Sequence, residues 1–539
     1  MDILFGLLGG LGLFLYGMHV MSSSLQRASG DKLKNIIGLL TTNRFLGVAV
    51  GAVVTAVVQS SSATTVMVVG FVNAGMMNLS QAVGVIMGAN IGTTVTAQVI
   101  AFKINDYAPI IIGIAMIVWL ATKNRRVKQL SEAFIGFGIL FIGMTFMGDA
   151  VSPLRELQAF QDLIVSFSDN PILGILAGFF ITVAVQSSSA STSILLALSL
   201  QGLVPLGAAL PVLFGINIGT TVTAIISSIG ANRTARRAAA AHLVFNIVGT
   251  LVFVIFLRDP LYWIVEQLSP NDVTRQIANA HTIFNVTSTI MLLPFAGLIV
   301  KTAKKMVPGE DDLQEGIKYI DIRLLETPSI AMNSATRETL HMGNTAKRTL
   351  HSALKGFFNK SEKEIMEAFK TEKIVNEIER ELSAYLVKVS NTDISMKNRE
   401  IVTGLFNTIN DIERVGDHAD NIAELALYRL ENNLHFSEEA IEELENMSTI
   451  TIDVYEKSLT ALTNLDYSLA LEVLEIENRI DEIEKKLRAN HIHRLNKNLC
   501  NSGSGVVFLD IISNLERISD HSSNIAYAVL DQIKLNSKS

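Results

Sequence analysis

The sequence predicts an all-α protein. We expect a polytopic membrane half with inverted repeats and two re-entrant helical hairpins, followed by a soluble helical bundle of two three-helix repeats. The chain has 539 residues, 49% of them hydrophobic, and a mean hydropathy of +0.37, so it is too long and too apolar for one soluble domain. The two halves of the chain differ in net charge. Residues 1–309 contain 18 Lys and Arg and 11 Asp and Glu, whereas residues 310–539 contain 26 Lys and Arg and 40 Asp and Glu. The first half also repeats one polar sequence after 127 residues.

Apolar runs build the membrane half. They fall at 3–21, 45–77, 81–103, 107–122, 133–150, 171–202, 205–228, 237–257 and 277–300. No basic segment precedes the first run, so we expect a span there and not a cleavable signal peptide. A span needs about 20 apolar residues. The runs 45–77 and 171–202 are longer and are interrupted midway, so each predicts a re-entrant hairpin. The other seven predict spans, of which 107–122 is short.

Basic residues predict the orientation of these spans. With the N-terminus outside, 14 Lys and Arg lie in cytoplasmic loops and four lie outside, namely Lys103, Arg155, Arg258 and Arg275. Cytoplasmic loops are expected to show this bias. Each repeat contains three crossings, an odd number, so the two copies are expected to have opposite orientations. Inverted repeats that meet at the midplane are a common plan of secondary transporters.

The two interruptions are copies of one another, and each is followed by a second copied block. The copies are Gln59-Ser-Ser-Ser62-Ala-Thr64-Thr65 with Gln186-Ser-Ser-Ser189-Ala-Ser191-Thr192, and Gly88-Ala-Asn90-Ile-Gly-Thr93-Thr94 with Gly215-Ile-Asn217-Ile-Gly-Thr220-Thr221. No charged residue occurs in 45–102 or 170–232. Broken helices offer N–H groups to anions and carbonyl groups to Na⁺, so a cation could offset the charge of an anion here. Close packing of helices through small residues is the alternative.

In this order the four blocks resemble the type II sodium–phosphate cotransporter family over about residues 1–300. The resemblance implies that phosphate and sodium bind where the repeats meet. The implied residues are Gln59, Ser60, Ser61, Ser62, Thr64, Thr65, Asn90, Thr93, Thr94, Gln186, Ser187, Ser188, Ser189, Ser191, Thr192, Asn217, Thr220 and Thr221.

A further string of that family, His-x-x-Phe-Asn, also occurs in this chain. It stands at His242–Asn246 and again at His281–Asn285, but Ile110-Ile-Ile-Gly-Ile follows the first Gly-Ala-Asn block instead. His242, Asn246, His281 and Asn285 are therefore further candidates for the site. A packing hydrogen bond made by each histidine is the alternative.

The acidic half shows a 3.6-residue period, which predicts helices near 329–358, 361–389, 398–430, 437–463, 466–498 and 505–535. Copied strings divide them into two triplets. Asp411-Ile-Glu413-Arg414-Val-Gly-Asp417-His418 matches Asn514-Leu-Glu516-Arg517-Ile-Ser-Asp520-His521 at an offset of 103, and Glu372–Glu379 matches Glu477–Glu484 at an offset of 105. The only cysteine, Cys500, excludes an internal disulfide framework.

Carboxylates four residues apart lie on one helical face and repel one another unless a cation joins them. From spacing alone, an ion-pair network with Arg414 and Arg517 and an oxygen-rich metal site both remain open. The pattern resembles PhoU, a helical regulator of phosphate uptake, over about residues 320–535. The resemblance implies a divalent metal or iron at Glu477, Asp481, Glu516 and Asp520. It implies a less complete second set at Glu372, Glu413 and Asp417, where Asn376 replaces an acid.

Both resemblances imply a sodium-coupled transporter of inorganic phosphate in the plasma membrane, with a cytoplasmic regulatory domain. We expect a transport domain at 1–305, with repeats at about 1–128 and 130–257, then a linker at 306–320 and the PhoU-like domain at 321–539. Expected partners are phosphate, Na⁺ and the lipid bilayer but no nucleic acid, and a homo-oligomer is left open. A phosphate exporter, or a membrane-anchored phosphate sensor, is the alternative. No P-loop, nucleophile–base pair or zinc-helix string predicts an enzyme.

Overall fold

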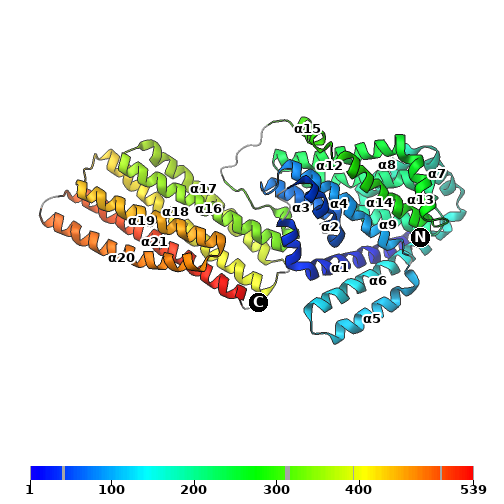
Figure 1. Ribbon diagram of the computed structural model, residues 1–539, viewed down its shortest axis with the longest axis horizontal. Coiled ribbons are helices and arrows are strands. Elements are labelled where there is room, and N and C mark those ends of the chain that lie inside the picture. Colours follow the sequence, from blue (N-terminus) through cyan, green and yellow to red (C-terminus); the bar gives the residue numbers. More distant parts are fainter. Residues whose placement is uncertain are drawn as a thin grey trace. The chain divides into compact units, whose positions relative to one another are not determined.

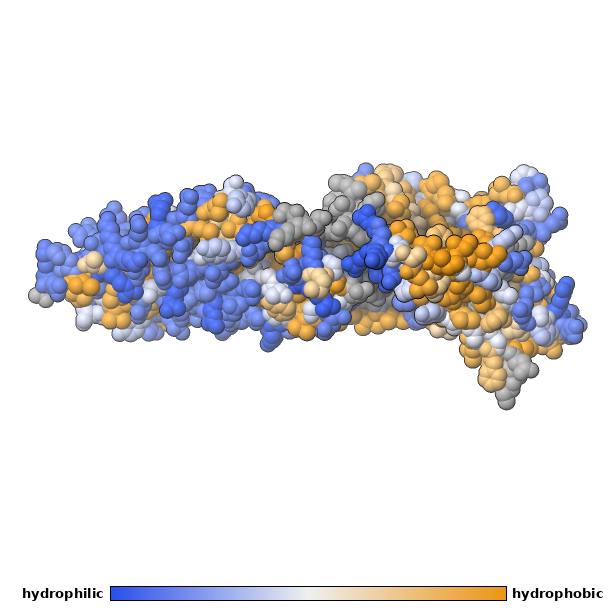
Figure 2. Space-filling view, turned by 90° about the horizontal axis from the view of Figure 1, so that it is seen from below, coloured by the Kyte–Doolittle hydropathy of each residue, from blue (hydrophilic) through white to orange (hydrophobic). Residues whose placement is uncertain are grey.

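The computed structural model describes residues 2–38, 43–102, 104–309, 316–392, 394–497 and 500–537. Throughout these ranges the regular structure is helical and no strand occurs (Figure 1), which confirms the all-α prediction. The chain forms two compact units, Met1–Asp312 and Leu313–Ser539. Hydrophobic side chains dominate the visible face of the first unit and hydrophilic ones that of the second (Figure 2). An apolar surface this extensive is expected to face lipid.

The first unit contains fifteen α-helices within the described residues. They are α1 (Asp2–Gly38), α2 (Arg44–Val58), α3 (Ser61–Asn73), α4 (Leu79–Ile100), α5 (Ala108–Ala121), α6 (Arg125–Val151), α7 (Gln158–Asp169), α8 (Pro171–Val185), α9 (Ser188–Leu200), α10 (Leu206–Gly219), α11 (Thr221–Ser227), α12 (Arg233–Val252), α13 (Arg258–Leu268), α14 (Val273–Leu292) and α15 (Ala296–Met306). Short 3₁₀ segments precede α5 and α7, and a π-helical segment, Phe253–Leu257, joins α12 to α13.

In the part of the chain that the structure describes, five helical segments are long and apolar enough to cross a membrane. They are Ile3–Leu25, Leu79–Ile100, Arg125–Glu156, Leu206–Ser227 and Arg233–Leu268. Two bent pairs raise the number to seven if each counts as one span, namely α7 with α8, bent by 111°, and α14 with α15, bent by 87°. These lengths are those of a multi-pass membrane protein.

Two of the predicted spans differ from the structure. Helix α5, in the run 107–122, has 14 residues and is about 21 Å long, which is too short to cross the hydrocarbon core by itself. The run 277–300 is not one straight helix, because α14 ends at Leu292, α15 begins at Ala296, and Pro294 lies between them. Proline lacks the backbone N–H that a continuing helix needs, so the chain bends there.

Both predicted hairpins are broken at the polar string. Gln59, which follows α2, has a φ of +57°, and Gln186, which follows α8, has a φ of +58°. This left-handed conformation is uncommon for a residue other than glycine, and it reverses the chain after each helix. Ser60 and Ser187 then cap the N-termini of α3 and α9. The re-entrant character of the hairpins stays a prediction.

Glycines at matching positions hold the two hairpins against their neighbours. A Cβ atom on Gly88 of α4 would collide with the carbonyl oxygen of Val48 in α2. The same collision would occur 127 residues later, between Gly215 of α10 and the carbonyl oxygen of Ile175 in α8. The backbones of α2 and α4, and of α8 and α10, therefore approach closely in the same way, as expected where small residues line a helix contact.

Helices α1 and α6 pack through glycines as well. A Cβ atom on Gly17 would collide with the carbonyl oxygen of Gly136, and one on Gly143 with that of Gly10. Residue number rises along α1 as it falls along α6, so the two helices are antiparallel. Gly10–Met18 resembles Gly136–Met144 at an offset of 126, so Gly10 corresponds to Gly136 and Gly17 to Gly143. Exchanging the repeats therefore maps this contact onto itself. The contact supports inverted repeats, which stay a prediction for the domain as a whole.

Helix α14 lies beside both hairpins. Helix α12 packs against α3 and α4, and α14 packs against α9 and α10 and also against α4. Helix α5 instead packs against α6 and exposes Ile110, Ile114 and Ile117. The His-x-x-Phe-Asn string that is missing from the first repeat is thus supplied in space by α14.

The described residues of the second unit form a bundle of six long helices. They are α16 (Pro328–Asn359), α17 (Glu362–Ser390), α18 (Met396–Glu431), α19 (Glu438–Asn464), α20 (Tyr467–Asn496) and α21 (Ser502–Ser537), preceded by a short 3₁₀ helix, Ile322–Glu326. Each predicted helix lies within three residues of an observed one. Helices α16–α18 pack together, α19–α21 pack together, and α18 lies against α21, which confirms the two triplets.

Candidate functional site

Three side-chain hydrogen bonds close the first hairpin tip. Thr96 Oγ1 of α4 donates to Gln59 Oε1 at 2.8 Å, so the glutamine that ends α2 is fastened to the neighbouring helix. Thr93 Oγ1 donates to Ser61 Oγ at 3.2 Å. A third bond, from Thr55 Oγ1 to Thr64 Oγ1 at 2.9 Å, joins α2 to α3. These groups are buried, and the side chain of Gln59 also donates to the carbonyl oxygen of Ala56.

The second tip has the same backbone but none of these bonds among its described residues. Gln186 is exposed, and Thr182 Oγ1, the counterpart of Thr55, is buried without a partner. Thr220 Oγ1 donates to the carbonyl oxygen of Ile216 in its own helix, whereas its counterpart Thr93 bonds across to the tip. The first tip is therefore closed and the second is open, although their sequences are nearly identical.

Each tip presents the start of a helix. Ser60 Oγ accepts a hydrogen bond from Ala63 N at 3.1 Å, and Ser187 Oγ accepts one from Ala190 N at 3.2 Å. These serines satisfy one N–H group of the first turn and leave others free to meet an anion. The positive end of the helix dipole adds to this preference.

Four asparagines of this unit adopt one conformation. The Nδ2 group of each donates to the carbonyl oxygen four residues earlier, which occurs at Asn90, Asn217, Asn246 and Asn285. Their side chains are buried, and the Oδ1 atoms of Asn246 and Asn285 have no partner. Asn285 Nδ2 also lies 3.4 Å from Asn217 Oδ1, which links α14 to the Gly-Ile-Asn block of α10. Amide oxygens held in this way are suitable ligands for Na⁺.

His242 and His281 lie inside the helical unit with exposures of 1% and 2%. Neither ring nitrogen of His281 has a hydrogen-bond partner in the described part of the chain, nor has Nδ1 of His242. The packing hydrogen bond considered for each histidine is therefore absent for His281. A buried polar group without a partner costs about 1–3 kcal/mol, so a ligand or a water molecule is expected at these rings.

The structure thus brings the predicted polar residues together as two sets. The tip of α2–α3 lies with α4 and α12, and the tip of α8–α9 lies with α10 and α14. Thr55, Thr96 and Thr182 were not among the predicted site residues. The signal that could have found them is repetition, because Thr55 recurs as Thr182 and Thr96 as Thr223 at the offset of 127 residues. Ser62 is half-buried and Ser189 is buried, so both remain candidates.

In the second unit, three of the predicted metal ligands converge. Carboxylate oxygens of Glu477, Asp481 and Asp520 lie within 4.8 Å of one another. Burial raises the pKa of Glu477, and the charges of Asp481 and Asp520 raise it further. Burial also raises the pKa of Glu516, with Asp520 and Asp481 adding to the shift. A cluster of carboxylates that repel one another is suited to bind a hard cation, because such a cation prefers oxygen ligands and offsets their charge.

The first repeat contains a related acidic set. Burial raises the pKa of Glu372, and the next contribution comes from Asp420, which was not predicted. Asn376 donates to the Glu372 carboxylate, so Asp420 on α18 supplies the acid that is absent at position 376. Burial and then Asp417 raise the pKa of Glu413. Asp420 was missed because its counterpart in the second repeat is Ser523.

The ion-pair alternative is met more fully in the first repeat. Arg414 lies 3.3 Å from Asp417 and 3.7 Å from Glu413, so its guanidinium partly neutralises this set. Arg517, its counterpart, forms no described salt bridge, although its charge acts to lower the pKa values of Glu516 and Asp520 against the larger effect of burial. The second repeat therefore fits a metal better than the first.

Comparison with known proteins agrees with both parts of the architecture. Residues 13–149 and 154–268 match the profile of the Na⁺/Pi-cotransporters, and residues 339–426 and 444–529 match that of the PhoU domain. The chain belongs to the Na⁺/Pi-cotransporter family and carries a PhoU domain.

Three relatives show how far the similarity extends. "Putative inorganic phosphate export protein YjbB" of Salmonella typhimurium is 25% identical over 530 residues, which cover 98% of this chain and 97% of that protein. "Uncharacterized protein YqeW" of Bacillus subtilis is 31% identical over 244 residues, which cover 45% of this chain and 79% of that protein. "Sodium-dependent phosphate transport protein 2A" of Rattus norvegicus is 40% identical over 97 residues, 18% of this chain and 15% of that protein.

Proposed function

We propose that the chain is a sodium-coupled transporter of inorganic phosphate whose PhoU domain lies in the cytoplasm and regulates transport. The observation that carries this proposal is the pair of hairpin tips, which have one backbone geometry and two hydrogen-bonding states. A site made of two such tips can change exposure by exchanging their states. The names of the relatives support phosphate as the substrate and Na⁺ as the coupling ion.

Phosphate would bind between the N-termini of α3 and α9. Backbone N–H groups and the hydroxyl groups of Ser61 and Ser188 are the available donors. No Lys or Arg occurs in residues 45–102 or 170–232. A multivalent anion in such a place needs compensating charge. Na⁺ ions held by the oxygens of Asn90, Asn217 and the tip glutamines would supply it.

Transport would follow from exchanging the two tips. In the state described here Gln59 bonds to Thr96, and Gln186, its counterpart, is exposed. In the opposite state Gln186 would bond to Thr223, the counterpart of Thr96, and Gln59 would be released. If the repeats are inverted, this exchange changes the side of the membrane to which the site opens.

The acidic sets of the PhoU domain would bind a divalent metal or iron. Glu477, Asp481, Glu516 and Asp520 are the ligands that we propose for the second repeat. Glu372, Glu413, Asp417 and Asp420 are those that we propose for the first. A bound cation would offset the repulsion that helps to raise the pKa values of Glu477, Glu516 and Asp520 in the second repeat, and of Glu372, Glu413 and Asp420 in the first.

Export of phosphate is the second candidate function, because the relative that matches nearly the whole chain carries that name. The same site would serve both directions of transport, and the direction of net flux would depend on the imposed gradients.

Purified protein in proteoliposomes should take up radiolabelled phosphate with an inward Na⁺ gradient and not with an equal K⁺ gradient. Efflux from preloaded vesicles is measured in parallel. Binding of phosphate without flux in either direction would contradict transport and support a sensor.

A further inference from the structure

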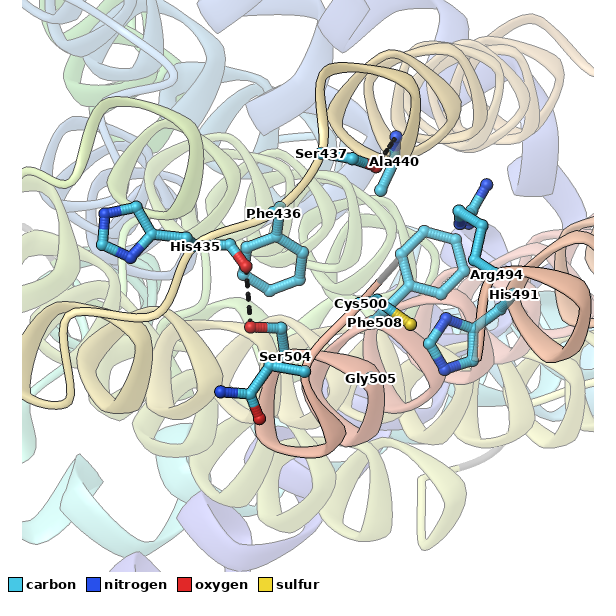
Figure 3. A pocket seen from close by; sticks show the side chains of 11 residues that line it. His435, Phe436, Ser437, Ala440, His491, Arg494, Cys500, Ser504, Gly505 and Phe508 are labelled. Carbon is cyan, nitrogen blue, oxygen red and sulfur yellow. Dashed lines mark hydrogen bonds between the residues drawn. The ribbon is translucent and has the colours of Figure 1, made fainter. Parts of the chain in front are cut away.

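A cavity of about 470 Å³ with a mixed polar and aromatic lining lies in the second repeat of the PhoU domain, apart from the acidic sets. Figure 3 shows its lining, which comes from the loop before α19, the end of α20 and the start of α21. Phe436, Phe508 and the ring of His491 contribute flat aromatic surfaces, and Ser504 Oγ donates to the carbonyl oxygen of His435 at 2.8 Å. None of the predicted metal ligands lines this cavity.

The charge of the lining favours an anion. Arg494 is the one charged side chain among the described lining residues, and none of them is Asp or Glu. Its guanidinium forms a 2.7 Å ion pair with Glu443, which does not line the cavity; the pair orients the guanidinium, offsets part of its charge and leaves further N–H donors. A buried, oriented guanidinium is well suited to bind a phosphate group through two parallel hydrogen bonds.

Two long helices begin at the cavity. Ser437, which caps α19, and Asn501, which precedes α21, both line it. Asn501 Oδ1 accepts from Gly503 N at 2.9 Å, and Ser437 Oγ accepts from Ala440 N at 3.2 Å. The remaining N–H groups of the two first turns lack partners within their helices, and both helix dipoles are positive at this end.

His491 gives an independent indication of a ligand. It is 3% exposed, it lines the cavity, and its Nε2 atom has no hydrogen-bond partner. A Cβ atom on Gly505 would lie 2.7 Å from this Nε2 atom, so glycine is needed there to make room for the ring. Burial of a ring nitrogen without a hydrogen-bond partner is unfavourable unless a ligand or a water molecule forms a hydrogen bond with it.

The first repeat shows that the fold does not require this cavity. The counterparts of His491 and Arg494 are Leu386 and Val389, and those of Gly505 and Phe508 are Val402 and Leu405. All four of these hydrophobic side chains are buried in the core. The same place is therefore filled with ordinary core residues in one copy and opened by a polar set in the other.

We propose that this cavity binds a phosphate group, either as inorganic phosphate or as part of a nucleotide. Arg494 and the starts of α19 and α21 would hold the phosphate oxygens, and Phe436 and Phe508 would contact a base if one is present. The PhoU domain would then bind a phosphate compound at a place separate from both the transport site and the acidic sets.

Cys500 makes a direct test possible, because it lines the cavity and is the only cysteine of the chain. The rate of its alkylation by iodoacetamide is measured by mass spectrometry on the full chain, in sodium-free buffer of constant ionic strength. Inorganic phosphate, AMP and adenosine are compared. If only the free cavity reacts, the rate falls by the factor 1 + [L]/Kd, which is about elevenfold at ten times the dissociation constant.

We expect inorganic phosphate or AMP to slow alkylation and adenosine to have no effect. Protection by AMP alone would assign a nucleotide, and protection by both would assign the free anion. Arg494→Val and His491→Leu, which introduce the residues of the first repeat, should abolish protection. Arg479→Val, on an exposed position of the same helix, should retain it. Thermal unfolding confirms that each variant is folded.

Gln59→Ala should also retain protection, because it alters the transport site and not the cavity. Failure of phosphate transport would therefore leave this proposal intact. Unchanged alkylation with both phosphate and AMP would overturn it. Equal protection of the unaltered chain and of folded Arg494→Val and His491→Leu variants would overturn it as well.

Discussion

Thr96 donates a 2.8 Å hydrogen bond to Gln59, but Thr223 makes no described bond to Gln186, its counterpart at the same offset. The two glutamines share a left-handed backbone conformation, with φ values of +57° and +58°. Their difference therefore lies in side-chain contacts and not in the local fold. Two nearly identical tips in different states are what alternation between two equivalent conformations requires.

The two threonines should affect stability differently and transport alike. Thr96→Val removes a buried hydrogen bond, which costs about 0.5–1.5 kcal/mol, so the melting temperature in detergent should fall. Thr223→Val should leave the melting temperature unchanged. Both variants should slow Na⁺-dependent phosphate flux if each tip must close once per cycle. Flux by Thr223→Val at the rate of the unaltered chain would show that the second tip does not close in this way.

A disulfide should trap the closed first tip. In a Cys500→Ser background, Ser61→Cys with Thr93→Cys places two thiols where hydroxyl oxygens lie 3.2 Å apart. Oxidation should stop transport and reduction should restore it. The matched pair Ser188→Cys with Thr220→Cys should crosslink more slowly, because Thr220 bonds within its own helix. Equal rates of crosslinking at the two tips would contradict the difference between them.

The tip glutamines themselves should be essential for transport. Gln59→Ala and Gln186→Ala should each abolish Na⁺-dependent phosphate uptake. Gln186→Ala should leave the melting temperature unchanged because its side chain is exposed, whereas Gln59→Ala should lower it. If both variants transported phosphate like the unaltered chain, the proposed site would be wrong.

The acidic set of the second repeat should make stability depend on pH and on metal. Burial and the charge of Asp481 raise the pKa of Asp520, so the folded state binds a proton more readily than the unfolded state. The contribution of this group to the free energy of unfolding therefore falls as the pH rises through the raised pKa. In EDTA at neutral pH, Asp520→Asn should raise the melting temperature of the chain.

Adding a divalent metal should make the unaltered chain more stable than the Asp520→Asn variant, the reverse of their order in EDTA. A cation at one hundred times its dissociation constant stabilises the folded state by about 2.7 kcal/mol. The unaltered chain should gain stability on adding Mn²⁺, and Asp520→Asn should gain much less. Asp510→Asn, on the same helix and exposed, should behave like the unaltered chain. An identical response of Asp520→Asn and the unaltered chain would exclude a metal at this set.

Much of the fold could be predicted because its signals are local. Helix period and capping residues located the six helices of the second unit, and the Gln-Ser-Ser-Ser strings located both breaks in the hairpins. Pro294 is also a local signal, although the apolar run around it concealed the bend. The closed and open tips could not be predicted, because Thr96 and Thr223 stand in matching sequences. Their difference arises from the conformation of the whole domain.

Asp420 was missed for a related reason. Comparison of the two repeats finds acidic residues that occur at matching positions in both. Asp420 has no acidic counterpart, because Ser523 stands at the matching position of the second repeat. Its role depends on the packing of α18 against α17, which brings it near Glu372. Long-range placement of this kind is set by tertiary structure and has no period in the sequence.

The position of α14 determines where the membrane domain can be divided. The two sequence repeats end near residue 257, but α14 packs against α4 of the first repeat and against α9 and α10 of the second. A fragment that stops at the repeat boundary would leave three helices without their common neighbour. Expression of each repeat as a separate polypeptide should therefore fail to reconstitute the domain unless α14 accompanies them.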